Sequence, residues 1–175
     1  MEAWAASRTI GNIGEVTVVI YEGRVCMLHF GSLKENEERI KRWLKKHIGA
    51  SCGLRAELHP LHNKVFRELE EYEANERTDF TVPLDMRGTP FQKRVWEALQ
   101  GIPYGMTKSY AEIAAEADSP KAFRAVGMAN NKNPVSIIVP CHRVIGKNGK
   151  MVGFGGGVHV KEGLLELERA QAVSR

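Results

Sequence analysis

The stretch SYAEIAAEADSPKAFRAVGMANN, residues 109–131, decides how the C-terminal half of this chain folds. Ser109 predicts the N-cap of a short helix, and Glu112, three residues later, completes a capping box. The pair Asp118–Ser119 interrupts that helix, and Pro120 predicts the start of the next one. Two short helices joined by a tight turn form a helix-turn-helix arrangement, in which the second helix enters a groove of DNA.

The segment just before this stretch predicts one more helix. In RGTPFQKRVWEALQGIPYG, residues 87–105, Thr89 is the expected N-cap and Pro90 the first helical residue. Gly101 ends the helix before Pro103. The apolar face comprises Phe91, Val95, Trp96 and Leu99.

The N-terminal half has a different pattern. In residues 13–30, Val16, Val18 and Ile20 alternate, YEGR forms a turn and Val25 to Phe30 return, which predicts a β-hairpin. Residues 34–47 predict a charged amphipathic helix, and residues 59–76 predict a second helix. Thr78–Asp85 is expected to form one more strand, closed by Pro83.

The chain is therefore expected to be an α+β protein of two domains. Residues 1–80 would form a small β-sheet with helices, and residues 81–175 a mainly helical DNA-binding domain. The first segment carries 12 Lys and Arg against 13 Asp and Glu, and the second carries 13 against 8. Residues 119–161 contain seven basic residues and no acidic one, which suits a polyanion such as DNA. A solvated basic face is the alternative.

Composition also limits the compartment. The three cysteines are an odd and scattered set, which indicates reduced thiols rather than a disulfide framework. The N-terminus has acidic residues and no apolar run, so no signal or transit peptide is expected. No segment is as long as a membrane span. We expect a cytoplasmic protein, or a nuclear one if the source is a eukaryote.

The stretch SIIVPCHRVIGKNG, residues 136–149, seats a lone cysteine, Cys141, between a proline and a histidine. One explanation is structural, with Cys141 as a small buried side chain after a core strand, SIIV. A second is a metal site, but Cys26 and His29 would point to opposite faces of a strand. No Cys-x-x-Cys pair is present, and Cys141–His142 alone has too few neighbouring ligands for a closed site. A zinc site in the first half of the chain stays an alternative, but no metal is predicted.

The third explanation is a nucleophile. A thiol with a pKa near 8.5 needs a base or positive surroundings to attack at neutral pH. His142, Arg143 and the acid-free segment supply them, and a carboxylate would orient the imidazole ring. Glu162, the first acidic residue after the segment, is the candidate for that role.

The residues around Cys141 resemble the active-site signature of the O6-alkylguanine-DNA alkyltransferases, also called methylated-DNA–protein-cysteine methyltransferases. Further segments occur in the family's order and spacing, so that the resemblance covers about residues 80–170. They are PLDMRGTPFQKRVWEAL, IPYG with SYAEIA, SPKAFRAVG, NKNPVSIIVPCHRVIG and GFGGGVHVKEGLL. The N-terminal part is similar to the family's variable domain, of ribonuclease H-like outline, only in general form.

The resemblance implies a DNA repair protein with a winged helix-turn-helix domain. Such a protein binds the minor groove, flips the damaged nucleotide out of the duplex, and moves the alkyl group irreversibly to its own cysteine. It implies O6-methylguanine, and O4-methylthymine, in duplex DNA as substrates. It also implies a monomer that acts once, without a cofactor.

Roles carry over by matching position. Cys141 would accept the alkyl group, His142 would act as base through a water, and Glu162 would hold His142. Asn133 would brace the turn that presents the cysteine, and Tyr110 would assist the leaving guanine. The remaining positions would bind substrate or DNA. Of these, Val144, Gly155 and Ser136 would line the base pocket, while Arg124, Ala111, Ser119, Ala125, Gly127, Ala129 and Lys147 would contact DNA.

Three positions depart from the family's pattern. Ser136 stands where some relatives carry proline, which puts tolerance of bulky alkyl groups in question. Phe154 and Gly155 replace a tyrosine and a serine-like residue of the glycine-rich loop. Two other functions fit parts of the pattern, namely a helix-turn-helix regulator with a sensor thiol and a lesion binder without catalysis. The presence of Cys141 argues against the second.

Overall fold

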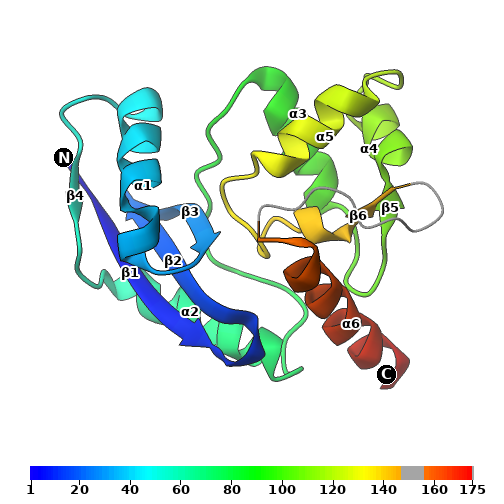
Figure 1. Ribbon diagram of the computed structural model, residues 1–175, viewed down its shortest axis with the longest axis horizontal. Coiled ribbons are helices and arrows are strands. Elements are labelled where there is room, and N and C mark those ends of the chain that lie inside the picture. The colour runs from blue at the N-terminus through cyan, green and yellow to red at the C-terminus, as the bar shows by residue number, and fades with distance from the viewer. Residues whose placement is uncertain (147–155, 175) are drawn as a thin grey trace. The chain divides into compact units, whose positions relative to one another are not determined.

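The computed structural model describes residues 1–146 and 156–174, and Figure 1 shows its elements. The chain divides into two compact units, Met1–Arg87 and Gly88–Arg175. The boundary lies seven residues after the predicted one at 80/81. The residues between the two positions are held to the first unit, as described below.

A four-stranded sheet forms the centre of the first unit. Its strands are β1 (Glu2–Ile10), β2 (Gly14–Tyr21), β3 (Arg24–Phe30) and β4 (Gly53–Arg55), in the order β3-β2-β1-β4. The first three are antiparallel, and β4 runs parallel to β1. The predicted hairpin is β2 and β3, joined by a turn at Glu22 and Gly23, both with positive φ.

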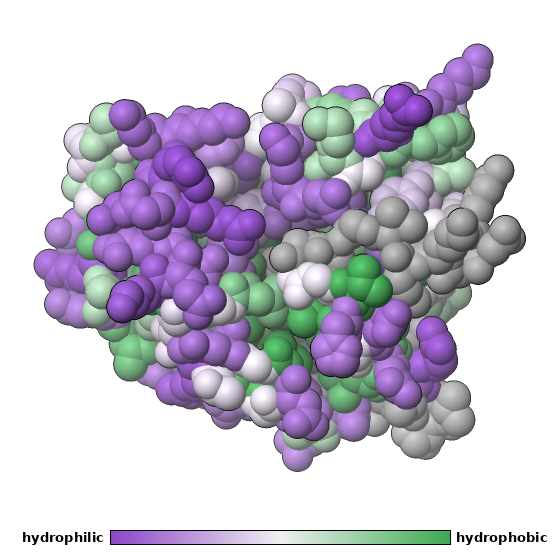
Figure 2. Space-filling model, in the orientation of Figure 1, coloured by the Kyte–Doolittle hydropathy of each residue, from purple (hydrophilic) through white to green (hydrophobic). Residues whose placement is uncertain are grey.

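Two helices cover opposite faces of this sheet. On one face, α1 (Leu33–His47) packs Ile40 and Leu44 against Ala3 and Ala5. Because neighbouring residues of a strand point to opposite faces, Trp4 lies on the face that the other helix, α2 (Pro60–Glu73), covers. Its ring contacts His59, the N-cap of α2. Every residue of β2 from Val16 to Tyr21 is therefore buried. The exposed side of α1 is charged, and Figure 2 shows the hydrophilic surface over it.

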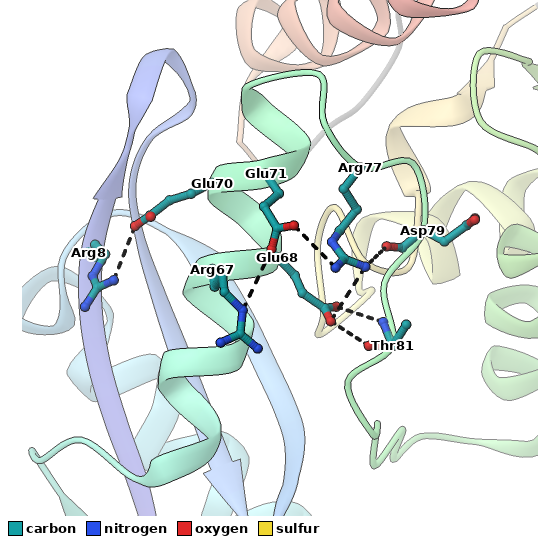
Figure 3. A network of polar contacts seen from close by, with 8 residues as sticks. All are labelled: Arg8, Arg67, Glu68, Glu70, Glu71, Arg77, Asp79 and Thr81. Atoms are coloured by element: carbon teal, nitrogen blue, oxygen red, sulfur yellow. Dashed lines mark hydrogen bonds and ion pairs between the residues drawn. The ribbon is translucent and has the colours of Figure 1, made fainter.

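The expected strand at Thr78–Asp85 is wrong. Only an isolated bridge joins this segment to β3, between Leu84 and Val25. A buried carboxylate on α2 holds the segment instead, as Figure 3 shows: Glu68 accepts hydrogen bonds from the backbone N–H of Thr81 at 2.8 Å and from its hydroxyl at 2.6 Å. Arg77 adds ion pairs to Glu68 and Glu71. Side chains thus satisfy groups that a sheet would otherwise pair.

The second unit carries the helix-turn-helix. Its elements are α3 (Pro90–Gln100), β5 (Lys108–Ser109), α4 (Tyr110–Glu116), α5 (Phe123–Asn131), the short 3-10 helix η2 (Cys141–Arg143), β6 (Val144–Ile145) and α6 (Val158–Ser174). Thr89 and Ser109 are the N-caps of α3 and α4, as predicted, and the predicted capping box at Ser109 is matched by one at Thr89. Asp118, with φ of 57°, ends the turn of α4. The predicted mixed α+β class is confirmed.

The helix α5 begins three residues later than Pro120 predicted, because Ser119 to Ala122 form a turn closed by the Ala122 N–H on the Ser119 carbonyl. Its buried side rests on α3, where the Trp96 indole N–H donates to the Ala129 carbonyl at 2.9 Å. Among the residues that the structure describes, no helix is long and apolar enough to cross a bilayer.

Candidate active site

Cys141 begins η2 at the end of a buried turn. The residues before it, Val135 to Val139, are mostly buried but form a turn rather than the expected core strand. Ile137 has φ of 70°, a left-handed conformation that is unusual for a β-branched residue. The backbone therefore turns sharply just before the cysteine, and this strain needs support from neighbouring groups.

Asn133 supplies that support. Its side-chain amide donates to the carbonyls of Val139, at 2.8 Å, and Val135, at 3.3 Å, and its oxygen accepts the Val135 N–H at 3.1 Å. One buried side chain thus bonds both ends of the turn. This geometry suits the bracing role that the resemblance implies.

The thiol of Cys141 is buried, with 3% of the residue exposed. Burial raises its pKa, while hydrogen bonds from the Asn133 and Ser136 side chains and the positive charge of Lys161 lower it, and burial dominates. The thiol is therefore protonated at neutral pH in the resting protein. The sequence had favoured a thiol made acidic by positive surroundings, so proton removal must belong to the reaction itself.

The carboxylate beside His142 is Glu168, which corrects the expectation for Glu162. The Nε2 of His142 lies 2.6 Å from Oε2 of Glu168, and both side chains are buried, whereas Glu162 is exposed. Burial lowers the pKa of His142, so its ring is neutral. Because Glu168 can only accept, Nε2 carries the proton and Nδ1 keeps its lone pair. Among the described residues, Nδ1 has no hydrogen-bond partner.

Glu168 also binds Arg143, and this explains its ionisation. The Arg143 Nε donates to Oε1 at 2.8 Å and Nη2 to Oε2 at 3.1 Å. Burial alone would raise the pKa of Glu168, but hydrogen bonds from His142 and Arg143 and the guanidinium charge lower it to about 2. Arg143 also donates to the Ile102 carbonyl at 2.8 Å. It therefore stabilises Glu168, whereas the sequence had suggested that Arg143 supplies positive surroundings for the thiol.

The helical phase of α6 explains why Glu168 was missed. The buried face of this helix carries Lys161, Leu164, Leu165 and Glu168, at the spacing i, i+3, i+4 and i+7. Glu162 lies one residue out of that phase. The helical period could have identified Glu168, because Leu164 and Leu165 mark the buried face of α6 and Glu168 follows them on that face. The prediction of Glu162 rested instead on its being the first acidic residue after the basic segment.

Lys161 is a second residue that the sequence did not single out. Its ammonium group is buried and donates to the Val144 carbonyl at 2.5 Å. Burial lowers the pKa of Lys161, and the Cys141 thiolate raises it. Val144 was predicted to line the base pocket, and this lysine fixes its carbonyl through one of the two lone pairs.

Tyr110 begins α4 and is half-buried near the cysteine. Burial raises its pKa, and the negative charge of a Cys141 thiolate raises it further. The phenol is thus a proton donor over the whole neutral range. Ser136, predicted to line the pocket, is buried and hydrogen-bonds the cysteine sulfur.

The residues predicted to touch DNA lie on α4, α5 and their turn. Arg124, Ala125, and Ala111 are exposed, and Ser119 and Gly127 are partly exposed. Ala129 differs, because it is buried against α3 and cannot press directly into a groove.

Some expectations cannot be placed. Lys147 and Gly155, together with Phe154, lie outside the described residues. In the described ranges, 1–146 and 156–174, no group of three or more His, Cys, Asp or Glu is arranged to hold a metal ion.

Comparisons with known proteins point in one direction. The family model described as "6-O-methylguanine DNA methyltransferase, DNA binding domain" matches residues 90–170. The methylated-DNA–protein-cysteine methyltransferase of Mycobacterium tuberculosis H37Rv is 59% identical over 105 residues, which are 60% of this chain and 64% of that protein. A constitutive enzyme of the same name from Bacillus subtilis 168 is 55% identical over 104 residues, 59% of this chain and 63% of that protein. The matches thus span just under two thirds of these curated relatives.

Structural similarity extends over both units. The crystal structure of Mycobacterium tuberculosis O6-methylguanine methyltransferase has a TM-score of 0.79 at 39% identity, covering 97% of this chain and 94% of that one. The structure of Mycobacterium tuberculosis OGT in complex with DNA has a TM-score of 0.78 at 38% identity, covering 96% and 94%.

Proposed function

The chain belongs to the O6-methylguanine-DNA methyltransferase family, and from this premise we propose that it repairs DNA by transferring the alkyl group of O6-methylguanine to Cys141. O4-methylthymine is a second substrate. The observation that carries the proposal is the buried thiol of Cys141, backed by the pair His142–Glu168 and flanked by Tyr110. The mycobacterial relative crystallised with DNA supports DNA as the partner.

The damaged nucleotide reaches this thiol by leaving the duplex, since O6 is not accessible to a side chain inside the stack. The helix α5 enters the minor groove, and Arg124 occupies the space of the extruded base. The main-chain groups of α4 and its turn, near Ala111 and Ser119, bind the DNA backbone. The region is basic, which favours this partner electrostatically.

The reaction is a displacement at the alkyl carbon. The Nδ1 of His142 takes the thiol proton through a water, and Glu168 stabilises the imidazolium that forms. The new bond joins sulfur to carbon, and the bond from carbon to O6 breaks. Tyr110 provides a proton to the guanine, which leaves as a neutral base rather than an anion. The thiol of Cys141 thus loses its proton only when the damaged nucleotide is bound beside it.

The product is a thioether, and Cys141 is the only cysteine after residue 52. No second thiol in that part of the sequence can remove the alkyl group, so each molecule acts once. A protein of this kind works as a monomer in the reducing compartment where DNA lies, which is the cytoplasm or, in a eukaryote, the nucleus.

The test is the mass of the intact protein after incubation with duplex DNA that contains one O6-methylguanine. We expect one methyl group per molecule, mapped to the peptide with Cys141 and absent in Cys141→Ala. With excess DNA, the amount of repaired lesion should equal the amount of protein. Multiple turnovers, or methylation at another residue, would contradict the proposal. Binding to a specific undamaged sequence without methyl transfer would instead indicate a regulator.

A further inference from the structure

Large apolar side chains are exposed on the helix that is proposed to enter DNA. Phe123 is 49% exposed and Met128 is 62% exposed, and both lie on the nine-residue helix α5. Six large hydrophobic side chains are exposed among the described residues, so two of the six share this short element. Scattered exposed apolar residues are ordinary, but two on one nine-residue helix are not scattered.

Phe123 and Met128 lie at the two edges of the exposed side of α5, with Arg124 between them. At about 100° per residue, Phe123, Gly127, Arg124 and Met128 follow one another around about 140° of the helix. The opposite side carries Val126 and Ala129, which are buried. Phe123 and Met128 therefore project from the side of the helix that faces away from the core.

This face adjoins the reaction site. A Cβ atom added at Gly127 would lie 3.9 Å from Cε1 of Tyr110, and the charge of a Cys141 thiolate acts on Tyr110. The ring of Tyr110 thus lies beside α5 at Gly127. The apolar pair consequently flanks the point at which an extruded nucleotide would pass toward the thiol.

The charges around the pair identify the occupant. Lys121, Arg124 and Lys132 are exposed on or beside α5, and the sequence has no acidic residue from 119 to 161. A polyanion fits this setting better than another protein's apolar surface, which would bring three cations into a dry contact. Minor-groove proteins commonly insert Phe or Met between base steps.

We propose that Phe123 and Met128 form an apolar wedge that enters the duplex on either side of Arg124 and stabilises the opened state. The side chains cover the faces of the base pairs that lose a stacking neighbour when the nucleotide leaves. Arg124 alone provides one positively charged side chain. The wedge adds apolar contact with the faces of the bases, which does not depend on the DNA sequence. This inference rests on the proposed function and adds to it the residues that lower the cost of extrusion.

The experiment compares Phe123→Ala, Met128→Ala and the double variant with wild type and with Leu58→Ala. Leu58 is 55% exposed but lies in the first unit, so its variant controls for loss of an exposed apolar side chain. Methyl transfer to Cys141 is timed on three substrates: duplex DNA with O6-methylguanine opposite cytosine, the same lesion opposite an abasic site, and the free base O6-methylguanine.

We expect each single variant to slow repair of the paired duplex by roughly fivefold or more, and the double variant further, because base–aromatic stacking is lost. The defect should shrink opposite the abasic site, where opening costs less. Transfer from the free base should stay within about twofold of wild type, since it needs no duplex opening. The Leu58→Ala protein should match wild type on all three substrates.

Two results would overturn the wedge. One is a rate on the paired duplex equal to that of Leu58→Ala. The other is an equal loss on all three substrates, which would place the effect at the thiol or in folding. A wild-type protein that accepts no methyl group from any substrate would instead refute the proposed function.

Discussion

At Cys141, the surroundings oppose ionisation in the resting protein, and this governs how the thiol must react. Burial raises its pKa more than Asn133, Ser136 and Lys161 lower it. A thiol that stays protonated is protected from oxidation and from stray electrophiles, because the thiolate is the reactive form. The neutral His142, held by Glu168, is the base that can remove the proton when a substrate is bound.

The pH dependence of Cys141 alkylation tests this interpretation. A raised pKa means that the thiolate fraction is small at neutral pH and still increases above pH 8.5, the ordinary value for cysteine. The rate of iodoacetamide labelling at Cys141, mapped by peptide mass, should therefore rise throughout pH 7 to about 9. Lys161→Met removes a charge that lowers the pKa, so its profile should move to still higher pH. A plateau near neutrality would contradict the prediction.

The identity of the carboxylate beside His142 gives a second prediction. In Glu168→Gln, the amide no longer stabilises a His142 imidazolium, and Arg143 is left as an unpaired buried charge. We expect methyl transfer to slow by about tenfold or more and the free energy of unfolding to fall by about 3–5 kcal/mol. Glu162→Gln is the matched control, because Glu162 is exposed on the same helix. Equal effects of the two substitutions on repair rate and urea unfolding would argue against the pair.

Which site residues the sequence could predict depended on their distance from Cys141 along the chain. Asn133, Cys141 and His142 lie within ten residues of one another, and their environment is set by one turn. Glu168 lies on α6, which is distant in the sequence from Cys141. Only the helical phase of α6, that is, which of its faces is buried, selects Glu168 over Glu162. Ala129 was misjudged for the same reason, because small size does not reveal which side of a helix is buried.

Among the elements, the predictions succeeded where a local signal fixes a boundary. Capping boxes place the starts of α3 and α4, because a Ser or Thr hydroxyl satisfies a backbone N–H that the helix leaves free. The hairpin of β2 and β3 was predictable from its turn. The strand β1 was not, since EAWAASRTI has few β-branched residues and depends on pairing with β2.

Elsewhere, tertiary contacts overrode the local pattern. The segment Thr78–Asp85 looks extended, yet Glu68 takes the hydrogen bonds that a partner strand would provide. The residues SIIV look like a core strand, yet Asn133 bonds the chain into a turn with Ile137 in a left-handed conformation. In both cases one buried polar side chain replaces a strand, and no rule of alternation can anticipate it.

For the whole molecule, the separation into two units was predictable in kind but not in position. The start of α3 after Thr89 was predictable from the sequence, whereas the contacts of residues 77–87 decide that they belong to the first unit. The excess of positive charge is likewise a property of the whole second half, 13 basic against 8 acidic residues from 81 onward. This positive charge attracts a polyanion to the unit that carries the Cys141 thiol.

Global stability in acid follows from the buried cluster of Glu168, His142 and Arg143. The pKa of Glu168 is about 2 in the folded protein and about 4.3 when unfolded. A lowered carboxylate pKa stabilises the fold above the unfolded value, and that contribution is lost as the pH falls from about 4.3 toward 2. The loss should amount to roughly 3 kcal/mol. Urea unfolding of the intact chain at several pH values between 7 and 2 measures this loss of unfolding free energy. Hydrogen exchange at the Trp96 indole N–H then reports the stability of the second unit alone. The Glu168→Gln protein should have a lower free energy of unfolding at pH 7 and should lack this part of its decrease with falling pH. If its free energy of unfolding fell with pH as steeply as in wild type, other carboxylates would cause the acid transition.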